Sequence, residues 1–172
     1  MGGRGSSSTT GKATTYKLYY GSTDTNIENL DVAAYGLVVD TGQPLLFFSE
    51  SRSEADELSH ERLPGPHPMV YQMGKKGRVY EVDVTMRRPL DFRSLSAKDK
   101  ENLMKLDPEG DLDEAMIDRL ASRNHSLLKS YVRLYPETLK QLGYDGVILY
   151  SDNKAKTLEY AVVSNDQVRI RR

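Results

Sequence analysis

Residues 143–163, GYDGVILYSDNKAKTLEYAVV, decide the predicted fold because two short apolar runs flank a polar turn. The runs over 147–150 and 160–163 are β-branched and aromatic, and residues 151–154 between them are turn formers, so the pattern predicts two adjacent strands. Glu159 stands at the head of the second strand. A carboxylate there can open onto a cleft, whereas deeper in the strand it would be desolvated and would need a partner. The sequence therefore makes Glu159 the leading candidate for a functional residue.

A helical region precedes this strand pair. Between Ser96 and Leu142 the apolar pattern becomes helical, and three helix starts or frames are expected. Ser96 is placed to cap a first helix, either Asp111 or Asp113 to cap a second, and Pro136 with Gly143 frames a third. This helical insert would separate the early strands from the last pair. The predicted fold class is therefore α+β.

Strands dominate the predicted first half. Residues 78–86 alternate polar and apolar, which indicates a strand with one buried face, and the segment 74–77 predicts a hairpin that joins it to a strand over 69–73. Three prolines within 63–68 exclude a helix or a central strand there. The remaining expected elements are a strand over 16–20, a short helix within 26–33, a strand over 44–48 and a helix that starts near Ser53.

Composition narrows the function classes. The chain has 172 residues, a net charge of −1 and no cysteine, so disulfides and thiolate zinc sites are excluded and a reducing cytosol is expected. The balanced charge gives no general reason for nucleic acid or an anionic membrane as a partner. No apolar run has the length of a membrane span, and the three scattered histidines indicate no metal site. Residues 1–15 are predicted to be a disordered N-terminal segment, and residues 16–172 one domain.

Several short motifs occur along the chain in the order in which they occur in one known superfamily. The sequence Glu-Tyr at 159–160, followed by Gln-Val at 167–168, resembles the C-terminal half of the ADP-ribosyltransferase superfamily. Leu-Tyr-Tyr-Gly-Ser at 18–22 and Phe-Phe-Ser at 47–49 resemble the family's first two signatures. The strand 79–84 and the turn Arg-Pro-Leu-Asp at 88–91 resemble a strand and a turn found in phage-associated and toxin-like members of this superfamily. The resemblance covers about residues 16–170 and implies a split, mixed β-sheet core.

The resemblance also implies an activity and a set of site residues. It suggests a mono-ADP-ribosyltransferase of phage or bacterial origin that cleaves the nicotinamide–ribose bond of NAD without a metal, in the host cytoplasm. Glu159 would be catalytic, because a carboxylate stabilises an oxocarbenium-like transition state. The acceptor would be a macromolecule, most simply a protein, with nucleic acid still open and no membrane partner. The NAD-binding residues implied are Tyr20, Gly21, Ser22, Phe47, Phe48 and Ser49.

Some positions depart from the family pattern. Tyr20 stands where many members have histidine or arginine. Strand alternation allows only one of the two phenylalanines to face a cleft, and Phe47 matches the stacking position, so Phe48 is expected in the core. Thr157 stands where members that modify arginine commonly have Glu or Gln, so arginine is not the expected acceptor.

Two other hypotheses compete with the transferase. The first is a catalytically inactive binding or inhibitor protein on the same scaffold, such as a phage effector, which the departure at Tyr20 favours. The second takes Tyr20, Gly21 and Ser22 as the opening of a γ-glutamyl cyclotransferase-like barrel. It ranks last because the C-terminal Glu-Tyr and Gln-Val pairs have no place in it.

Overall fold

A computed structural model describes residues 11–36, 45–151 and 156–172, and within them the chain has an α+β fold. A mixed sheet of seven strands has the order β6-β7-β8-β2-β1-β5-β9, and β3 and β4 form a separate two-stranded sheet. The α+β prediction is confirmed. The strands are β1 (Thr14–Ser22), β2 (Leu46–Ser49), β3 (His60–Pro64), β4 (Tyr71–Lys76), β5 (Arg78–Met86), β6 (Pro89–Asp91), β7 (Gly146–Tyr150), β8 (Leu158–Val162) and β9 (Val168–Ile170).

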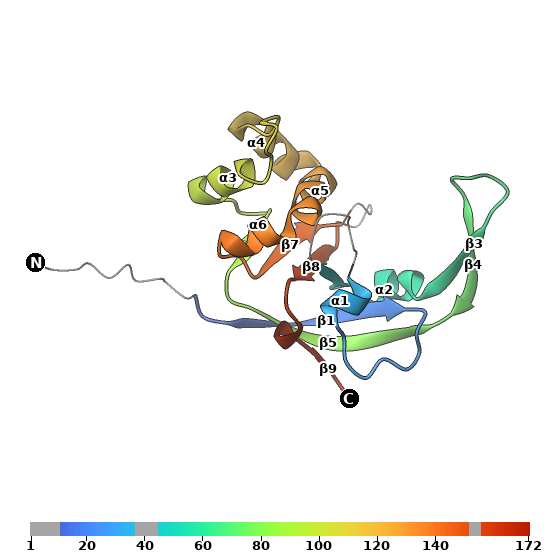
Figure 1. Cartoon of the computed structure of the whole chain (residues 1–172). Helices are drawn as coiled ribbons and strands as arrows, with labels where there is room; N and C mark the ends of the chain where they lie inside the picture. Colours follow the sequence, from blue (N-terminus) through green and yellow to red (C-terminus); the bar gives the residue numbers. More distant parts are fainter. Residues whose placement is uncertain (1–10, 37–44, 152–155) are drawn as a thin grey trace, which may run out of the picture.

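Helices cover one face of the large sheet at its β6–β8 end (Figure 1). They are α3 (Ala97–Met104), α4 (Glu114–Arg123), α5 (His125–Leu134) and α6 (Pro136–Gln141), while α1 (Val32–Tyr35) and α2 (Arg52–Leu58) lie beside the middle strands. The core beneath the helical layer includes Phe92, Leu128 and Leu149. A second core on the opposite face includes Leu18, Phe48 and Val82. The central strands of the sheet are therefore covered on both faces.

Capping residues set the helices of the predicted insert. Ser96 begins α3 with a capping box in which its hydroxyl accepts from Asp99, and Asp113 caps α4. Pro136 begins α6, and Gly143 follows it with φ of +89°, a conformation that favours glycine. These three predicted helices are confirmed. The remaining helix of the insert, α5, was not predicted, because only Asn124 separates it from α4.

The last strand pair also follows the prediction. β7 and β8 run antiparallel with Gly146 opposite Val162 and Tyr150 opposite Leu158, and β6 runs parallel to β7 on its other side. Because a parallel connection needs a long crossover, the four helices between β6 and β7 supply it. The helical insert is thus what carries the chain back to the sheet.

The predicted hairpin between residues 69–73 and 78–86 is wrong. β4 pairs with β3, and β5 instead forms nine residue pairs with β1. A Cβ on Gly77 would lie 2.1 Å from the Ser22 carbonyl oxygen, so the glycine marks a close crossing of the chain rather than a turn. The turn lies at the proline-rich segment, where the Gly65 N–H donates to the Val70 carbonyl at 3.0 Å.

The N-terminal boundary differs slightly from the prediction. Thr14 and Thr15 belong to β1, two residues earlier than expected, and residues 1–10 of the predicted disordered segment lie outside the described residues. No helix in the described ranges is long and apolar enough to cross a membrane.

Candidate functional site

Three motif-bearing strands lie next to one another in the sheet, in the order β8, β2, β1. Ser49 on β2 is opposite Glu159 on one side and Tyr19 on the other. Residues directly opposite in antiparallel strands share a face. Glu159, Ser49 and, two residues along, Phe47 therefore share the face that carries the helical layer, whereas Tyr20 and Phe48 belong to the opposite face.

Glu159 contacts a cation from the helical layer. Its Oε2 lies 2.5 Å from Nζ of Lys129 on α5, and the two side chains are only 16% and 20% exposed. The same Nζ lies 4.4 Å from the centre of the Phe47 ring, and the Arg133 guanidinium lies 5.7 Å from the same ring centre. One ammonium group therefore contacts both a carboxylate and an aromatic face.

This arrangement fits a positively charged group. A carboxylate attracts a cation through its charge, and an aromatic face attracts it through the ring quadrupole, most strongly where water is largely excluded. Both partners come from the sheet, on neighbouring strands, while the cation comes from a helix. The pair formed by Glu159 and Phe47 is chemically suited to stabilise positive charge, whether it resides on a lysine or on a ligand.

A second carboxylate stands beside this pair. Oε2 of Glu54, in the first turn of α2, accepts hydrogen bonds from Ser49 Oγ at 2.6 Å and from Thr157 Oγ1 at 2.8 Å. Ser49 is opposite Glu159 in the sheet, and Thr157 precedes Glu159 by two residues, so Glu54 fixes the hydroxyl groups of two residues that neighbour Glu159 in the sheet or along the chain. The α2 start that makes this possible is capped by Ser51, two residues before the predicted start.

Sequence reasoning missed both Lys129 and Glu54 as members of this site. Glu54 lies in the first turn of the helix predicted to start near Ser53, where an acid interacts favourably with the helix dipole, but no site role was predicted for it. Lys129 and Arg133 have the four-residue spacing of one helical face. That spacing was the available signal for a cationic helix face, but α5 itself was not predicted.

Tyr20 and Phe48 belong to the core on the opposite face. Phe48 is buried, as strand alternation predicts, and the Tyr20 ring lies 5.8 Å from it and 6.5 Å from the Tyr35 ring. Burial, together with the neighbouring Tyr35, raises the pKa of Tyr20 to about 12. The structure therefore does not bring these two predicted site residues together with Glu159.

Gly21 and Ser22 each have a local structural role. A Cβ on Gly21 would lie 1.8 Å from the Ala55 carbonyl oxygen, so glycine is what allows α2 to approach β1 this closely. Ser22 Oγ accepts a hydrogen bond from the Asp24 N–H at 3.1 Å, which shapes the turn after β1.

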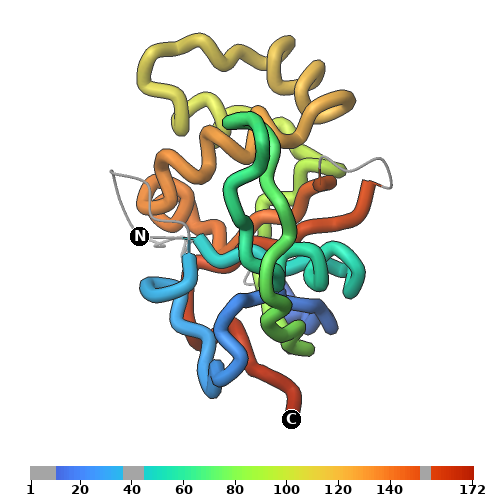
Figure 2. The backbone as a smooth tube through the Cα atoms, turned by 90° about the vertical axis from the view of Figure 1, so that its right-hand side faces the viewer, coloured from blue at the N-terminus to red at the C-terminus, as the bar shows by residue number. Residues whose placement is uncertain are grey.

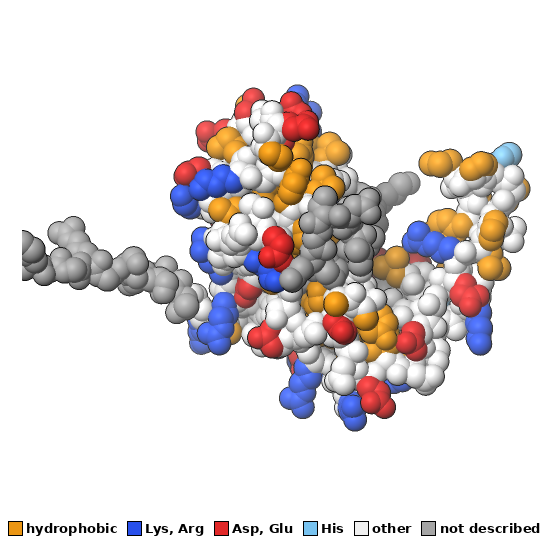
Figure 3. Space-filling view, viewed as in Figure 1, with side chains coloured by type: hydrophobic (Ala, Val, Ile, Leu, Met, Phe, Trp, Pro, Cys, Tyr) orange, Lys and Arg blue, Asp and Glu red, His pale blue; other side chains and the backbone are white. Residues whose placement is uncertain are grey.

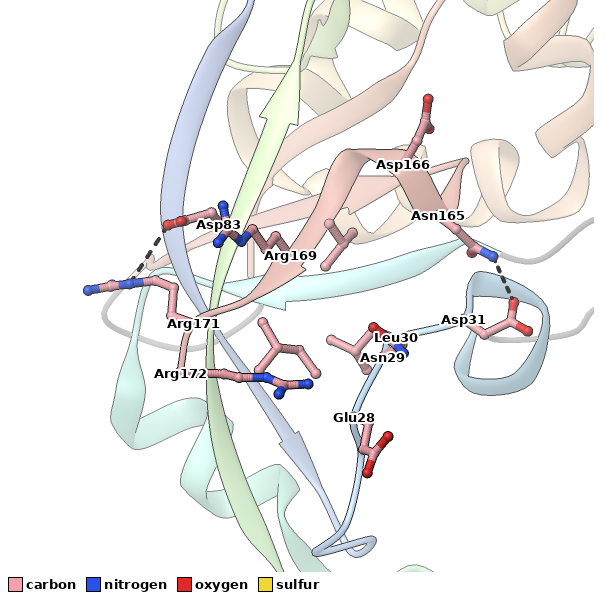
Figure 4. A pocket seen from close by; sticks show the side chains of 12 residues that line it. Glu28, Asn29, Leu30, Asp31, Asp83, Asn165, Asp166, Arg169, Arg171 and Arg172 are labelled. Carbon is pink, nitrogen blue, oxygen red and sulfur yellow. Dashed lines mark hydrogen bonds and ion pairs between the residues drawn. The ribbon is translucent and has the colours of Figure 1, made fainter.

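A shallow hollow of about 950 Å³ lies beside β9, at the edge of the sheet away from the helical layer (Figure 4). Acidic and basic side chains line it together, among them Asp83, Asp166, Arg169 and Arg171, and Arg171 Nε lies 3.8 Å from Asp83 Oδ1. None of the predicted site residues belongs to its lining. The hollow is thus separate from the Glu159 cluster.

No group of three or more His, Asp or Glu side chains within the described ranges is arranged to hold a metal ion. The sequence matches no protein-family model, and a search of curated proteins finds no match. Among solved structures, one described as "Crystal structure of an anti-CRISPR protein" is similar, with 17% identity, 91% of this chain and 96% of that chain covered, and a TM-score of 0.47. A similarity of this size assigns neither a family nor a function.

Proposed function

We propose that this protein is an NAD-dependent mono-ADP-ribosyltransferase with a protein acceptor, and that Glu159 is its catalytic carboxylate. The observation that carries the proposal is the shared cation: Glu159 and Phe47 both contact the ammonium group of Lys129. The proposal combines this geometry with the motifs that resemble ADP-ribosyltransferases.

The chemistry of the reaction calls for such a pair. The nicotinamide ring of NAD is a pyridinium cation, and a phenylalanine face attracts it. When the bond from the ribose C1′ to the ring nitrogen breaks, the bonding electrons leave with nicotinamide and positive charge develops on the ribose. A fixed carboxylate next to that charge lowers the barrier. In this proposal Lys129 holds the site in the absence of NAD, and the ring and ribose replace it.

Two further contacts support this role for Glu159. Ser49 and Thr157, the hydroxyl neighbours of Glu159, are both hydrogen-bonded to Glu54, so the groups around the carboxylate are held in place. In addition, three of the strands that carry resemblance motifs, β8, β2 and β1, are adjacent in the sheet. Motifs that are far apart in sequence thus come from neighbouring strands.

The second candidate is a catalytically inactive protein that acts by binding. Two observations favour it: Lys129 neutralises the charge of Glu159, and Tyr20 packs in the core on the other face. A structural ion pair with Lys129 would then be the whole role of Glu159.

Incubation of the purified protein with NAD labelled in its adenylate half separates the two candidates. The transferase releases free nicotinamide and either transfers the label to protein in a bacterial lysate or leaves it as free ADP-ribose. Release of nicotinamide without the added protein is the background control. If NAD stays intact at high protein concentration, with and without lysate, the transferase proposal is wrong and the binding protein replaces it.

A further inference from the structure

The two-stranded sheet of β3 and β4 forms a hairpin arm, residues 60–77, that projects from the end of β1 and β5 (Figures 1 and 2). It rises on the side of the sheet where the helical layer lies, and in the space-filling view it stands clear of the body (Figure 3). No residue from 61 to 76 is buried. The hairpin arm therefore contributes no core residue from 61 to 76, and most of its side chains are exposed to solvent.

Large apolar side chains gather on this arm. Single exposed apolar residues are normal on a protein surface, but a contiguous group indicates an interaction site. Met69 at the tip is 94% exposed. Of the nine large hydrophobic residues that are exposed in the described ranges, five lie on the hairpin arm: Leu63, Met69, Val70, Tyr71 and Met73.

The hairpin arm is held in shape although it is exposed. At its base, Lys76 Nζ lies 2.6 Å from Asp56 Oδ1, and the Gly77 N–H donates to the Ser59 carbonyl at 2.9 Å. At its tip, the Gly65 N–H donates to the Val70 carbonyl. A pre-ordered element loses little conformational entropy when it binds a partner. Its shape therefore suits recognition better than a flexible loop would.

The charge of the hairpin arm is positive. It carries Arg62, Lys75 and Lys76 against Glu61 alone, on a chain whose net charge is −1. The Arg62 guanidinium lies 4.6 Å from the centre of the Tyr71 ring, and Met73 is opposite Arg62. One face of the hairpin thus combines a cation, an aromatic ring and a methionine, which are the side chains enriched in protein–protein interfaces.

We propose that the hairpin arm is a docking element for a protein whose surface offers an apolar groove with a rim of carboxylates. The apolar groove takes Met69, Tyr71 and Met73, and the carboxylates pair with Arg62 and Lys75. A nucleic acid suits the arm less well, because Tyr71 is the arm's only Phe, Tyr or Trp and the aliphatic side chains do not recognise a phosphate backbone. The proposal does not depend on the reaction at Glu159.

A random copolymer of glutamate and tyrosine supplies the carboxylates and the apolar rings of such a partner, and serves as the probe. Polyglutamate supplies the charge without the apolar groups, and a thymidine oligonucleotide supplies phosphates with stacking bases. Binding of each to the full chain is measured by titration, and amide chemical shifts locate the contact. The double variant Met69→Ser, Met73→Ser removes apolar contacts from the arm. Leu127→Ser is the control, because Leu127, like Met73, is half exposed but lies on α5.

The copolymer should bind the wild type and the Leu127→Ser variant alike, with shifts at residues 61–76. The double variant should bind it at least about tenfold more weakly, as expected when apolar anchors are lost, and polyglutamate should bind weakly to all three. Melting curves of the variants show whether the fold is retained. Equal copolymer binding by the double variant, shifts outside the arm, or tighter binding of the oligonucleotide through the arm would each overturn the proposal.

Discussion

Replacement of Lys129 by methionine tests the role of the ammonium group that contacts both Glu159 and Phe47. Methionine keeps most of the aliphatic length of the lysine but removes the ammonium group that contacts Glu159 at 2.5 Å and the Phe47 ring at 4.4 Å. The variant therefore leaves a carboxylate that is 16% exposed without its counter-ion. Two measurable consequences follow, one for stability and one for ligand binding.

The loss of stability can be bounded from the exposure of the pair. Removal of one partner from a fully buried ion pair costs about 3–5 kcal/mol, whereas an exposed pair contributes at most about 1 kcal/mol. At 16% and 20% exposure the pair lies between these limits. We expect Lys129→Met to lower the free energy of unfolding by about 1–3 kcal/mol.

The effect on NAD binding has the opposite sign. If NAD replaces the ammonium group, the wild type must break the pair before it binds, and the variant need not. The same loss of about 1–3 kcal/mol then corresponds to roughly 5- to 150-fold tighter binding of NAD by the variant. The binding gain distinguishes a displaced cation from a purely structural one.

Urea unfolding and NAD titration of the same samples measure both quantities. Lys98→Met is the control, because Lys98 forms a pair with Glu101 at 3.3 Å in which the side chains are 61% and 54% exposed, so its loss should change stability by at most about 1 kcal/mol. Equal stability of Lys129→Met and the wild type would refute the estimate of the pair. Weaker NAD binding by Lys129→Met would refute displacement of the lysine.

Three further predictions concern the scaffold. Tyr144→Phe removes the hydroxyl that accepts from the buried Asn102 Nδ2 at 2.9 Å, so it should lower the free energy of unfolding by about 1–3 kcal/mol in urea. Because the pKa of Tyr20 is raised to about 12, the folded state keeps a proton that the unfolded state loses near pH 10; stability should fall as the pH rises from about 10 to about 12, and less steeply in Tyr20→Phe when unfolding is followed at each pH. Gly21→Ala should cost about 1–3 kcal/mol in thermal unfolding, because the new methyl group would lie 1.8 Å from the Ala55 carbonyl oxygen.

Local signals in the sequence predicted the elements that are set locally. Ser96 and Asp113 cap their helices as expected because a cap depends on the three residues that follow it. The pair formed by β7 and β8 was also predicted, since two strands that follow one another pair most simply with each other. The α+β class followed from these elements alone.

Pairings between distant segments were not predictable in the same way. Glycines towards the C-terminal end of β4 indicate a turn into β5. The long alternating strand β5 instead forms nine residue pairs with β1, and β4 pairs with β3. Within the site, Glu159 and Phe47 were identified from motifs on strands. Lys129 reaches them only because the insert packs on that face of the sheet, which no local pattern encodes.

Turnover of NAD by a Glu159→Gln variant tests the central claim most directly. Glutamine keeps the size of the side chain but removes the charge that would oppose the oxocarbenium ion. We expect the rate of nicotinamide release to fall on the order of 10²–10³-fold, while NAD affinity changes far less because the charge develops in the transition state. Glu81→Gln, a carboxylate on the same face of the sheet that pairs with Arg52 at 2.9 Å, is the control and should retain the wild-type rate. Near wild-type release by Glu159→Gln, or an equal loss in both variants, would contradict the assignment of Glu159 as the catalytic carboxylate.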